Sequence, residues 1–234
     1  MKKRGKFIVI EGGDSSGKEV QSKRLIKALR SLGYKVRFLD FPRYNQFHGK
    51  VVGRYLAGEF GDAYEVSPWL AAYPYANDRL GLRDSIIESL EDGQVIVSNR
   101  YVGSNLGYMS AKLPRRQRED FIRWNEEFEY KRLGLPREDV SIFLYVPARI
   151  GQKLTYRKDE KVYMKGKGRG DIHERNLQYL EQAINQFLWL TRNRNHWVRV
   201  DSTLKGDGKK LRPAEDIHRD IMDILVKRRI IDRS

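Results

Sequence analysis

Residues 7–18, FIVIEGGDSSGK, constrain the fold of this chain more than any other stretch. The run opens with four apolar residues, Phe7 to Ile10, which are typical of a buried strand. Gly12 and the pair Gly17-Lys18 follow at the G-x-x-x-x-G-K spacing of a phosphate-binding loop. Glycines let backbone N–H groups turn toward a phosphate, the N-terminus of the next helix adds partial positive charge, and Lys18 adds a full charge. The stretch predicts an anion site between a strand and a helix.

A bare motif of this kind also occurs by chance, as a turn that only joins two elements. Here the helix that begins at Gly17 carries an apolar stripe and ends at Gly33, so strand, loop and helix come in the required order. The loop is therefore predicted to bind a nucleotide. One position departs from the motif, because Ser or Thr normally follows the lysine and supplies a hydroxyl to Mg²⁺, whereas this chain has Glu19.

The composition of the 234 residues is that of one globular domain, residues 1–234, with 40% hydrophobic and 33% charged residues. No apolar run approaches the ~18 residues of a membrane span, and the first strand is too short for a signal-peptide core, so a cytoplasmic protein is expected. The absence of cysteine excludes disulfides, thiolate zinc sites and thiol catalysis.

The net charge of +15 favours anionic partners, which can be nucleotides or nucleic acid polymers. Scattered lysines and arginines are more often a solvated surface than a binding site. Only residues 157–169 concentrate the charge, with six basic residues against Asp159 and Glu160.

Five strands are expected at residues 7–10, 35–39, 94–98, 141–146 and 197–201. Helices are expected after Gly17, at 48–58 and at 67–90 with a kink at Pro74. Three more are expected from Leu113-Pro114 to a close at Gly134 and Pro136, from the capping-box pair Asp171 and Glu174 through Leu188, and from Pro213 through Leu225. This alternation predicts a five-stranded parallel sheet with helices on both faces. Ligands of such sheets bind beyond the carboxyl ends of the strands. The residues expected at this edge are Asp14, residues 41–44, residues 99–101 and Asp201.

Arg43, Arg79 and Arg100 are the arginines of interest, although each alone is more often a structural or solvated charge. Arg43 and Arg100 follow strands at the expected binding edge. Guanidinium groups there suit phosphate oxygens, so two phosphate-bearing ligands would explain both residues.

Four motifs together resemble the thymidylate kinase family in order and spacing: Gly12 to Lys18, Phe41-Pro42, Tyr75-Ala76-Asn77-Asp78-Arg79, and Asn99-Arg100-Tyr101-Val102-Gly103-Ser104. The similarity covers nearly the whole chain, including the closing Trp197 to Asp201. It implies the P-loop nucleoside monophosphate kinase fold and a homodimer. It also implies transfer of the γ-phosphoryl of ATP, with Mg²⁺, to the 5′-phosphate of dTMP, giving dTDP and ADP.

The resemblance also implies roles for single residues. Asp14 would approach the 3′-hydroxyl of the acceptor sugar, Tyr75 would stack on the base, Arg79 would hydrogen-bond the base, and Arg100 would grip the acceptor phosphate. The remaining acceptor residues that the resemblance implies are Phe41, Arg43, Ser104 and Tyr108. The residues that would bind ATP are Gly13, Ser15, Ser16, Gly17, Lys18, Glu19 and Asp201.

Residues 157–170 are interpreted as a lid, because phosphoryl transfer needs cations around the equatorial oxygens and exclusion of water. Gly166, Gly168 and Gly170 punctuate the segment, and Arg157 and Arg169 would supply charge on closure. An exposed loop and a polymer-binding loop are the alternatives.

Glu19 and Asn99 depart from the family pattern, which has a hydroxyl at the first position and an acidic residue at the second. Under a compensation hypothesis, Glu19 supplies the missing carboxylate and both residues bind Mg²⁺. Under a decay hypothesis, the extra charge weakens ATP binding, and the protein is a catalytically weak relative that binds nucleotide or nucleic acid. Met109 replaces a glutamine near the base, which leaves dUMP or another deoxynucleotide open as acceptor.

Two rival functions remain at this point. A deoxynucleoside kinase would need a carboxylate base after the second strand, and Asp40 is the candidate. A basic P-loop protein could instead bind nucleic acid, but the sequence shows no interleaved aromatic and basic strand pattern of a stacking platform, so this partner is not expected. A working kinase is favoured, with positioning and charge rather than a general base carrying the rate.

Overall fold

The computed structural model describes residues 4–156, 162–164, 170–204 and 210–232. Five parallel strands form one sheet in the order β2-β3-β1-β4-β5, which confirms the predicted fold class. Their bounds are β1 Phe7–Gly12, β2 Val36–Asp40, β3 Val95–Asn99, β4 Val140–Tyr145 and β5 Trp197–Asp201.

The helices alternate with these strands along the chain. They are α1 Lys18–Ser31, α2 Phe47–Leu56, α3 Pro68–Leu80, α4 Arg83–Glu91, α5 Val102–Ala111, α6 Arg115–Glu126, the π-helix η1 Glu127–Arg132, α7 Ala148–Thr155, the 3₁₀ helix η2 Val162–Met164, α8 Leu177–Asn193 and α9 Ala214–Lys227.

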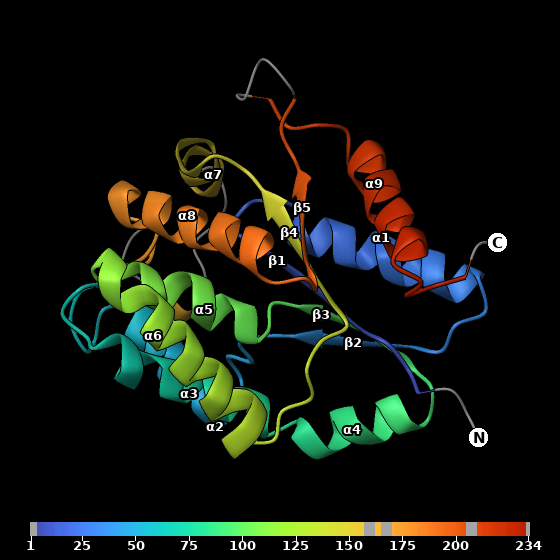
Figure 1. Cartoon of the computed structure of the whole chain (residues 1–234). Helices are drawn as coiled ribbons and strands as arrows, with labels where there is room; N and C mark the ends of the chain where they lie inside the picture. Colours follow the sequence, from blue (N-terminus) through green and yellow to red (C-terminus); the bar gives the residue numbers. More distant parts are fainter. Residues whose placement is uncertain (1–3, 157–161, 165–169, 205–209, 233–234) are drawn as a thin grey trace.

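Both faces of the sheet are buried under helices (Figure 1), and strand β1 shows how. Because side chains alternate along a strand, Ile8 and Ile10 pack in one cluster with α1 and α9, whereas Phe7 and Val9 pack in another with α4, α5 and α8. Helices α2, α3 and α6 share a third cluster and form a further layer beyond α5.

Three features of the helices differ from the sequence-based expectations. The segment expected as one kinked helix over 67–90 is two helices, and the break lies at Gly81-Leu82, whereas Pro74 lies inside α3. Asp171 and Glu174 form the reciprocal bonds of a capping box, but α8 begins only at Leu177, with Asn176 as its N-cap. Helices α5 and α7 were not expected, because both are short and follow directly on a strand end that was interpreted as a loop.

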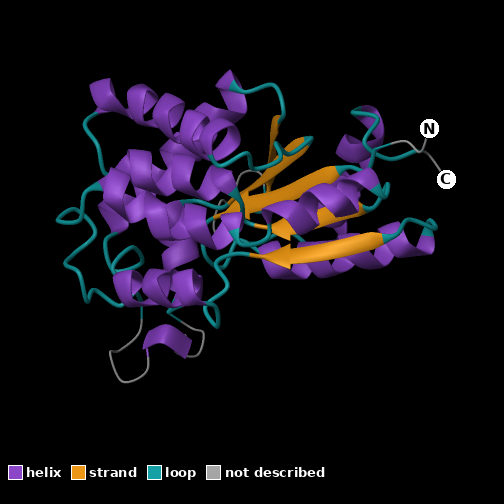
Figure 2. Cartoon of the chain, turned by 90° about the horizontal axis from the view of Figure 1, so that it is seen from below, coloured by secondary structure: helices purple, strands orange, loops and turns teal. Residues whose placement is uncertain are grey.

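The carboxyl ends of the strands lie at one edge of the sheet, as expected. The strand register pairs Asn99 with both Ile10 and Asp40, and pairs Tyr145 with Asp201. In Figure 2 the strand arrowheads point toward the part of the molecule where most of the helices lie. Within the described part of the chain, no helix is long and apolar enough to cross a membrane.

Candidate active site

The loop between β1 and α1 has the geometry of a phosphate cradle. Gly17 has a φ of 93°, in the left-handed region that favours glycine. A Cβ added at Gly12 would lie 2.5 Å from Ser16 Oγ and 2.9 Å from Leu144 O, so only glycine fits there. Lys18, at the first position of α1, is buried, and its Nζ donates to Gly13 O at 2.7 Å. The backbone therefore curls as the sequence motif predicts.

The hydroxyl of Ser16 fits an anion ligand at this loop. Ser16 is buried, and within residues 4–156, 162–164, 170–204 and 210–232 its Oγ has no hydrogen-bond partner. Buried hydroxyls are usually satisfied, so a phosphate oxygen is a suitable acceptor for it. The predicted ATP-binding role of Ser15, whose Oγ lies 3.1 Å from Thr155 Oγ1, stays a prediction.

Arg100 connects this loop with the end of β3. Its Nη2 donates to Asp14 Oδ1 at 2.5 Å, its Nη1 donates to Ser104 Oγ at 3.3 Å, and its guanidinium lies over the ring of Tyr108 at 5.3 Å. Arg100 has a φ of 65°, which is rare for a residue with a side chain and is typical of functional sites. Burial opposes its charge, but Tyr108, Asp14 and Glu11 raise the pKa of Arg100 well above its ordinary value, so it stays cationic.

Glu11 holds the segment that carries Arg100. Its carboxylate is fully buried and accepts from Tyr101 N at 2.9 Å and from Ser104 Oγ at 2.7 Å. Burial raises the pKa of Glu11, although Arg100 and these two hydrogen bonds act in the opposite direction. Strand β1 thus fixes the start of α5, a role that the sequence analysis missed.

Beyond the carboxyl ends of the strands lies a cleft with about 640 Å³ of empty volume. Seven residues predicted for the acceptor nucleotide line it together: Asp14, Phe41, Tyr75, Arg79, Arg100, Ser104 and Tyr108. Burial raises the pKa of Tyr75 and, to about 12, that of Tyr108, so both phenols are neutral near pH 7 and offer apolar rings with a polar tip.

Two predicted residues are held by contacts elsewhere. Arg43 donates through Nε to Asp78 Oδ1 at 3.0 Å and through Nη2 to Asp78 O at 2.5 Å. Asp201 accepts from the neighbouring Arg199 on β5, with Nη2 to Oδ1 at 2.5 Å. Their predicted roles, a phosphate contact for Arg43 and an ATP contact for Asp201, stay predictions.

The predicted metal ligands, Glu19 and Asn99, both lie near Asp40. Glu19 is mostly exposed and its Oε1 accepts from Lys23 Nζ at 2.6 Å, whereas Asn99 Nδ2 donates to Asp40 Oδ1 at 2.7 Å. Asn99 Oδ1 is buried and has no hydrogen-bond partner within the described chain, so a neutral oxygen ligand remains for a hard cation.

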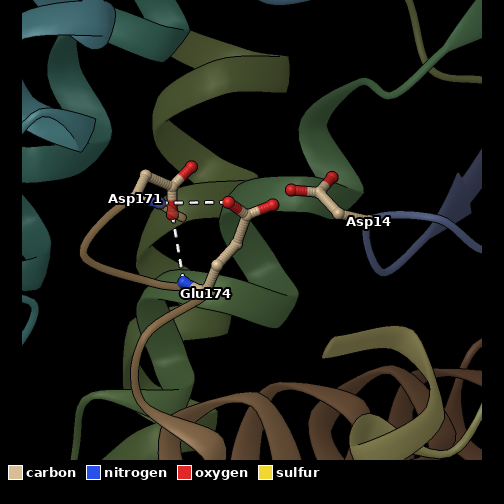
Figure 3. A group of neighbouring side chains, drawn as sticks. All are labelled: Asp14, Asp171 and Glu174. Carbon is tan, nitrogen blue, oxygen red and sulfur yellow. Dashed lines mark hydrogen bonds between the residues drawn. The ribbon is translucent and has the colours of Figure 1, made fainter. Parts of the chain in front are cut away.

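A second oxygen-rich group lies across the cleft (Figure 3). One carboxylate oxygen from each of Asp14, Asp171 and Glu174 lies within 4.8 Å of the others. Asp171 Oδ1 also accepts from the backbone N–H of Glu174, and Glu174 Oε2 accepts from that of Asp171, so the turn before α8 fixes these two side chains. The group is chemically suited to a divalent cation. Asp171 and Glu174 were expected from the sequence only as a capping pair.

The lid arginines Arg157 and Arg169 lie outside the described residues, as does most of the segment 157–170. In its described part, η2, Tyr163 OH donates to Asp171 Oδ2 at 2.8 Å, and Tyr163 lines the cleft. Asn105 also lines the cleft and was missed, because its position one turn before Met109 becomes visible only once α5 is recognised as a helix.

Comparison with known proteins decides the family. The family model described as thymidylate kinase matches residues 10–209. The chain belongs to the thymidylate kinase family. This family membership confirms the predicted resemblance and makes the chain a nucleoside monophosphate kinase by class.

Three relatives show the extent of the likeness. A thymidylate kinase of Mycobacterium tuberculosis is 35% identical over 145 residues, which cover 62% of this chain and 67% of that protein. A thymidylate kinase of Plasmodium falciparum is 29% identical over 228 residues, 97% of this chain and 92% of that protein. The structure of thymidylate kinase from Candida albicans, at 21% identity, superposes with a TM-score of 0.72 and covers 99% of this chain and 96% of that one.

Proposed function

We propose that this chain transfers the γ-phosphoryl group of ATP to the 5′-phosphate of dTMP, giving dTDP and ADP. The observation that carries the proposal is the position of Asp14, which belongs to the phosphate-binding loop and also lines the cleft, where it accepts from Arg100. A donor nucleotide on the loop and an acceptor in the cleft would therefore meet at this residue.

The residues have distinct tasks in this reaction. The loop backbone, Ser16 and Lys18 bind the donor phosphates, and Arg100 binds the acceptor phosphate on the opposite side. Tyr75 and Tyr108 hold the nucleoside between their rings, while Arg79 reads the base. The negative charge of the transferring phosphoryl group is spread over its oxygens. Positioning and fixed positive charge therefore supply most of the rate enhancement.

A bound Mg²⁺ would supply positive charge that offsets the charge of the phosphates. Glu19 and Asn99 are the proposed residues for it under the compensation hypothesis, supported by the oxygen of Asn99, which has no hydrogen-bond partner among the described residues. Asp40, the base candidate of the rival deoxynucleoside kinase, accepts from Asn99 Nδ2 through Oδ1, and burial raises its pKa, so an assay must decide between the two reactions.

The test is a coupled ADP-release assay with Mg²⁺-ATP against dTMP, dUMP, dCMP, dAMP, dGMP and thymidine. The proposal expects fastest turnover with dTMP and its loss in Lys18→Ala. Turnover with thymidine alone would support the deoxynucleoside kinase instead. No turnover with any acceptor, but recovery in the double variant Glu19→Thr, Asn99→Asp, would support a decayed metal site.

A further inference from the structure

A buried carboxylate behind the cleft orients the arginine assigned to the base. Glu129 is fully buried and accepts from Arg79 twice, from Nε at 2.6 Å and from Nη2 at 2.7 Å. Glu129 lies in η1, where the helix widens to a π-helix, a local irregularity that is frequent at functional sites. The two parallel bonds fix the plane of the guanidinium.

The same carboxylate also orients the amide of Asn105. Asn105 Nδ2 donates to Glu129 Oε1 at 3.0 Å and to Ala72 O at 3.2 Å. Because a carboxylate and a carbonyl only accept hydrogen bonds, the amide must turn its nitrogen to this side and its oxygen away from it. Asn125 Nδ2 adds a further bond to Glu129 Oε1 at 2.9 Å.

The oxygen of Asn105 is buried beside the cleft. Asn105 is 1% exposed and lines the cleft, and within the part of the chain that the structure describes its Oδ1 has no hydrogen-bond partner. Arg79, also 1% exposed, lines the cleft too, and its Nη1 uses one of two hydrogens on Tyr101 O at 3.3 Å. Leaving a buried acceptor unpaired costs about 1–3 kcal/mol, so a ligand group is the natural partner.

Glu129 orients both a donor on Arg79 and an acceptor on Asn105. Together these two groups match one edge of a pyrimidine. Thymine and uracil present the N3–H donor beside the O4 acceptor, which complements this pair. Cytosine presents the N3 acceptor beside an amino donor, which would meet like groups at both points. Discrimination of this kind is strong because the wrong base leaves buried polar groups unpaired.

We propose that Glu129 is a positioning residue that sets the base specificity of the acceptor site for 4-oxo over 4-amino pyrimidines. This inference rests on the proposed function and deepens it. It also accounts for Met109, because the amide that this position lacks is supplied one turn earlier on α5, at Asn105. The arrangement does not distinguish dTMP from dUMP, which differ only at the 5-methyl group.

The test is the specificity of Glu129→Gln, which keeps the shape but brings an amino donor against the donors of Arg79 and Asn105. We expect the ratio of kcat/KM for dTMP to that for dCMP to fall at least about tenfold, mainly through a higher KM for dTMP. The dTMP to dUMP ratio should stay unchanged. A merely structural defect would instead lower kcat alike for every acceptor.

Glu138→Gln is the matched control, because Glu138 is also buried and accepts from Tyr130 OH at 2.7 Å and from Ser141 Oγ at 3.0 Å. This variant should keep the dTMP to dCMP ratio of the wild type. A wild-type ratio in folded Glu129→Gln would overturn the proposal.

Asn105→Leu decides the question if Glu129→Gln does not fold, because it removes only the amide. It should also lose the preference for dTMP over dCMP, and retention of that preference would overturn the proposal.

Equilibrium binding of dTMP and dCMP, measured by calorimetry, separates the role of Glu129 from the proposed kinase activity. A wild type that bound dTMP preferentially yet transferred no phosphoryl group would refute the kinase proposal. If Glu129→Gln abolished that binding preference, the role of Glu129 would still be supported.

Discussion

Replacing Arg100 by alanine should separate catalysis from stability. In the proposed complex the guanidinium donates two charge-assisted hydrogen bonds to the acceptor phosphate, and each contributes about 1.5–3 kcal/mol. Their loss amounts to about 3–6 kcal/mol, or a fall of about 10² to 10⁴ in kcat/KM for dTMP.

The stability cost of the same change should be small. The ion pair of Arg100 with Asp14 is part-exposed, with side-chain exposures of 15% and 31%, and such pairs contribute up to about 1 kcal/mol. In a chain of this size that corresponds to a Tm lowered by about 2–4 °C.

Arg194→Ala is the matched control, because Arg194 forms a similar part-exposed pair with Glu126 at 3.1 Å, away from the cleft. Both variants are measured by the coupled assay and by thermal unfolding. We expect a similar small change in Tm for the two variants and a large loss of turnover only for Arg100→Ala. Wild-type turnover in folded Arg100→Ala would refute the assignment of Arg100 to the acceptor phosphate.

Three further predictions concern titration, assembly and polymer binding. Burial lowers the pKa of Lys112 from 10.5 to about 8, so the unfolded chain binds more protons between these pH values and stability should rise with pH there. Urea unfolding at pH 8, 9 and 10 should show this gain relative to Lys112→Met, and parallel curves would contradict it. We expect a homodimer, which light scattering would contradict by reporting one chain mass. Binding to DNA should be weak and vanish at moderate salt, whereas tight binding with a steep salt dependence in a filter assay would favour the nucleic acid rival.

Local patterns in the sequence were sufficient to predict the sheet and the phosphate-binding loop. The loop from Gly12 to Lys18 is specified by the steric needs of consecutive backbone positions, and the apolar strands are specified by burial on both faces. The same local logic was wrong about the length of the helix expected over 67–90, because the chain breaks at Gly81-Leu82 into two helices.

The parts of the site that were missed depend on contacts between residues far apart in the chain. Glu129 lies 50 residues from Arg79 and 24 from Asn105, and no spacing rule connects them. The capping-box pattern predicted the local bonds of Asp171 and Glu174 but not their approach to Asp14. Arg43 was predicted to contact a phosphate from its place after β2. Its ion pair with Asp78 was not predicted, because Asp78 lies 35 residues further along the chain.

The most direct test of the proposed function follows the transferred phosphoryl group itself. The protein is incubated with Mg²⁺ and ATP labelled at the γ-phosphate, together with dTMP, and the products are separated by chromatography. We expect the label in dTDP, with no label in dTDP when Lys18→Ala replaces the wild type. Label that stays in ATP, or is released only as inorganic phosphate, would contradict phosphoryl transfer between the loop and the cleft.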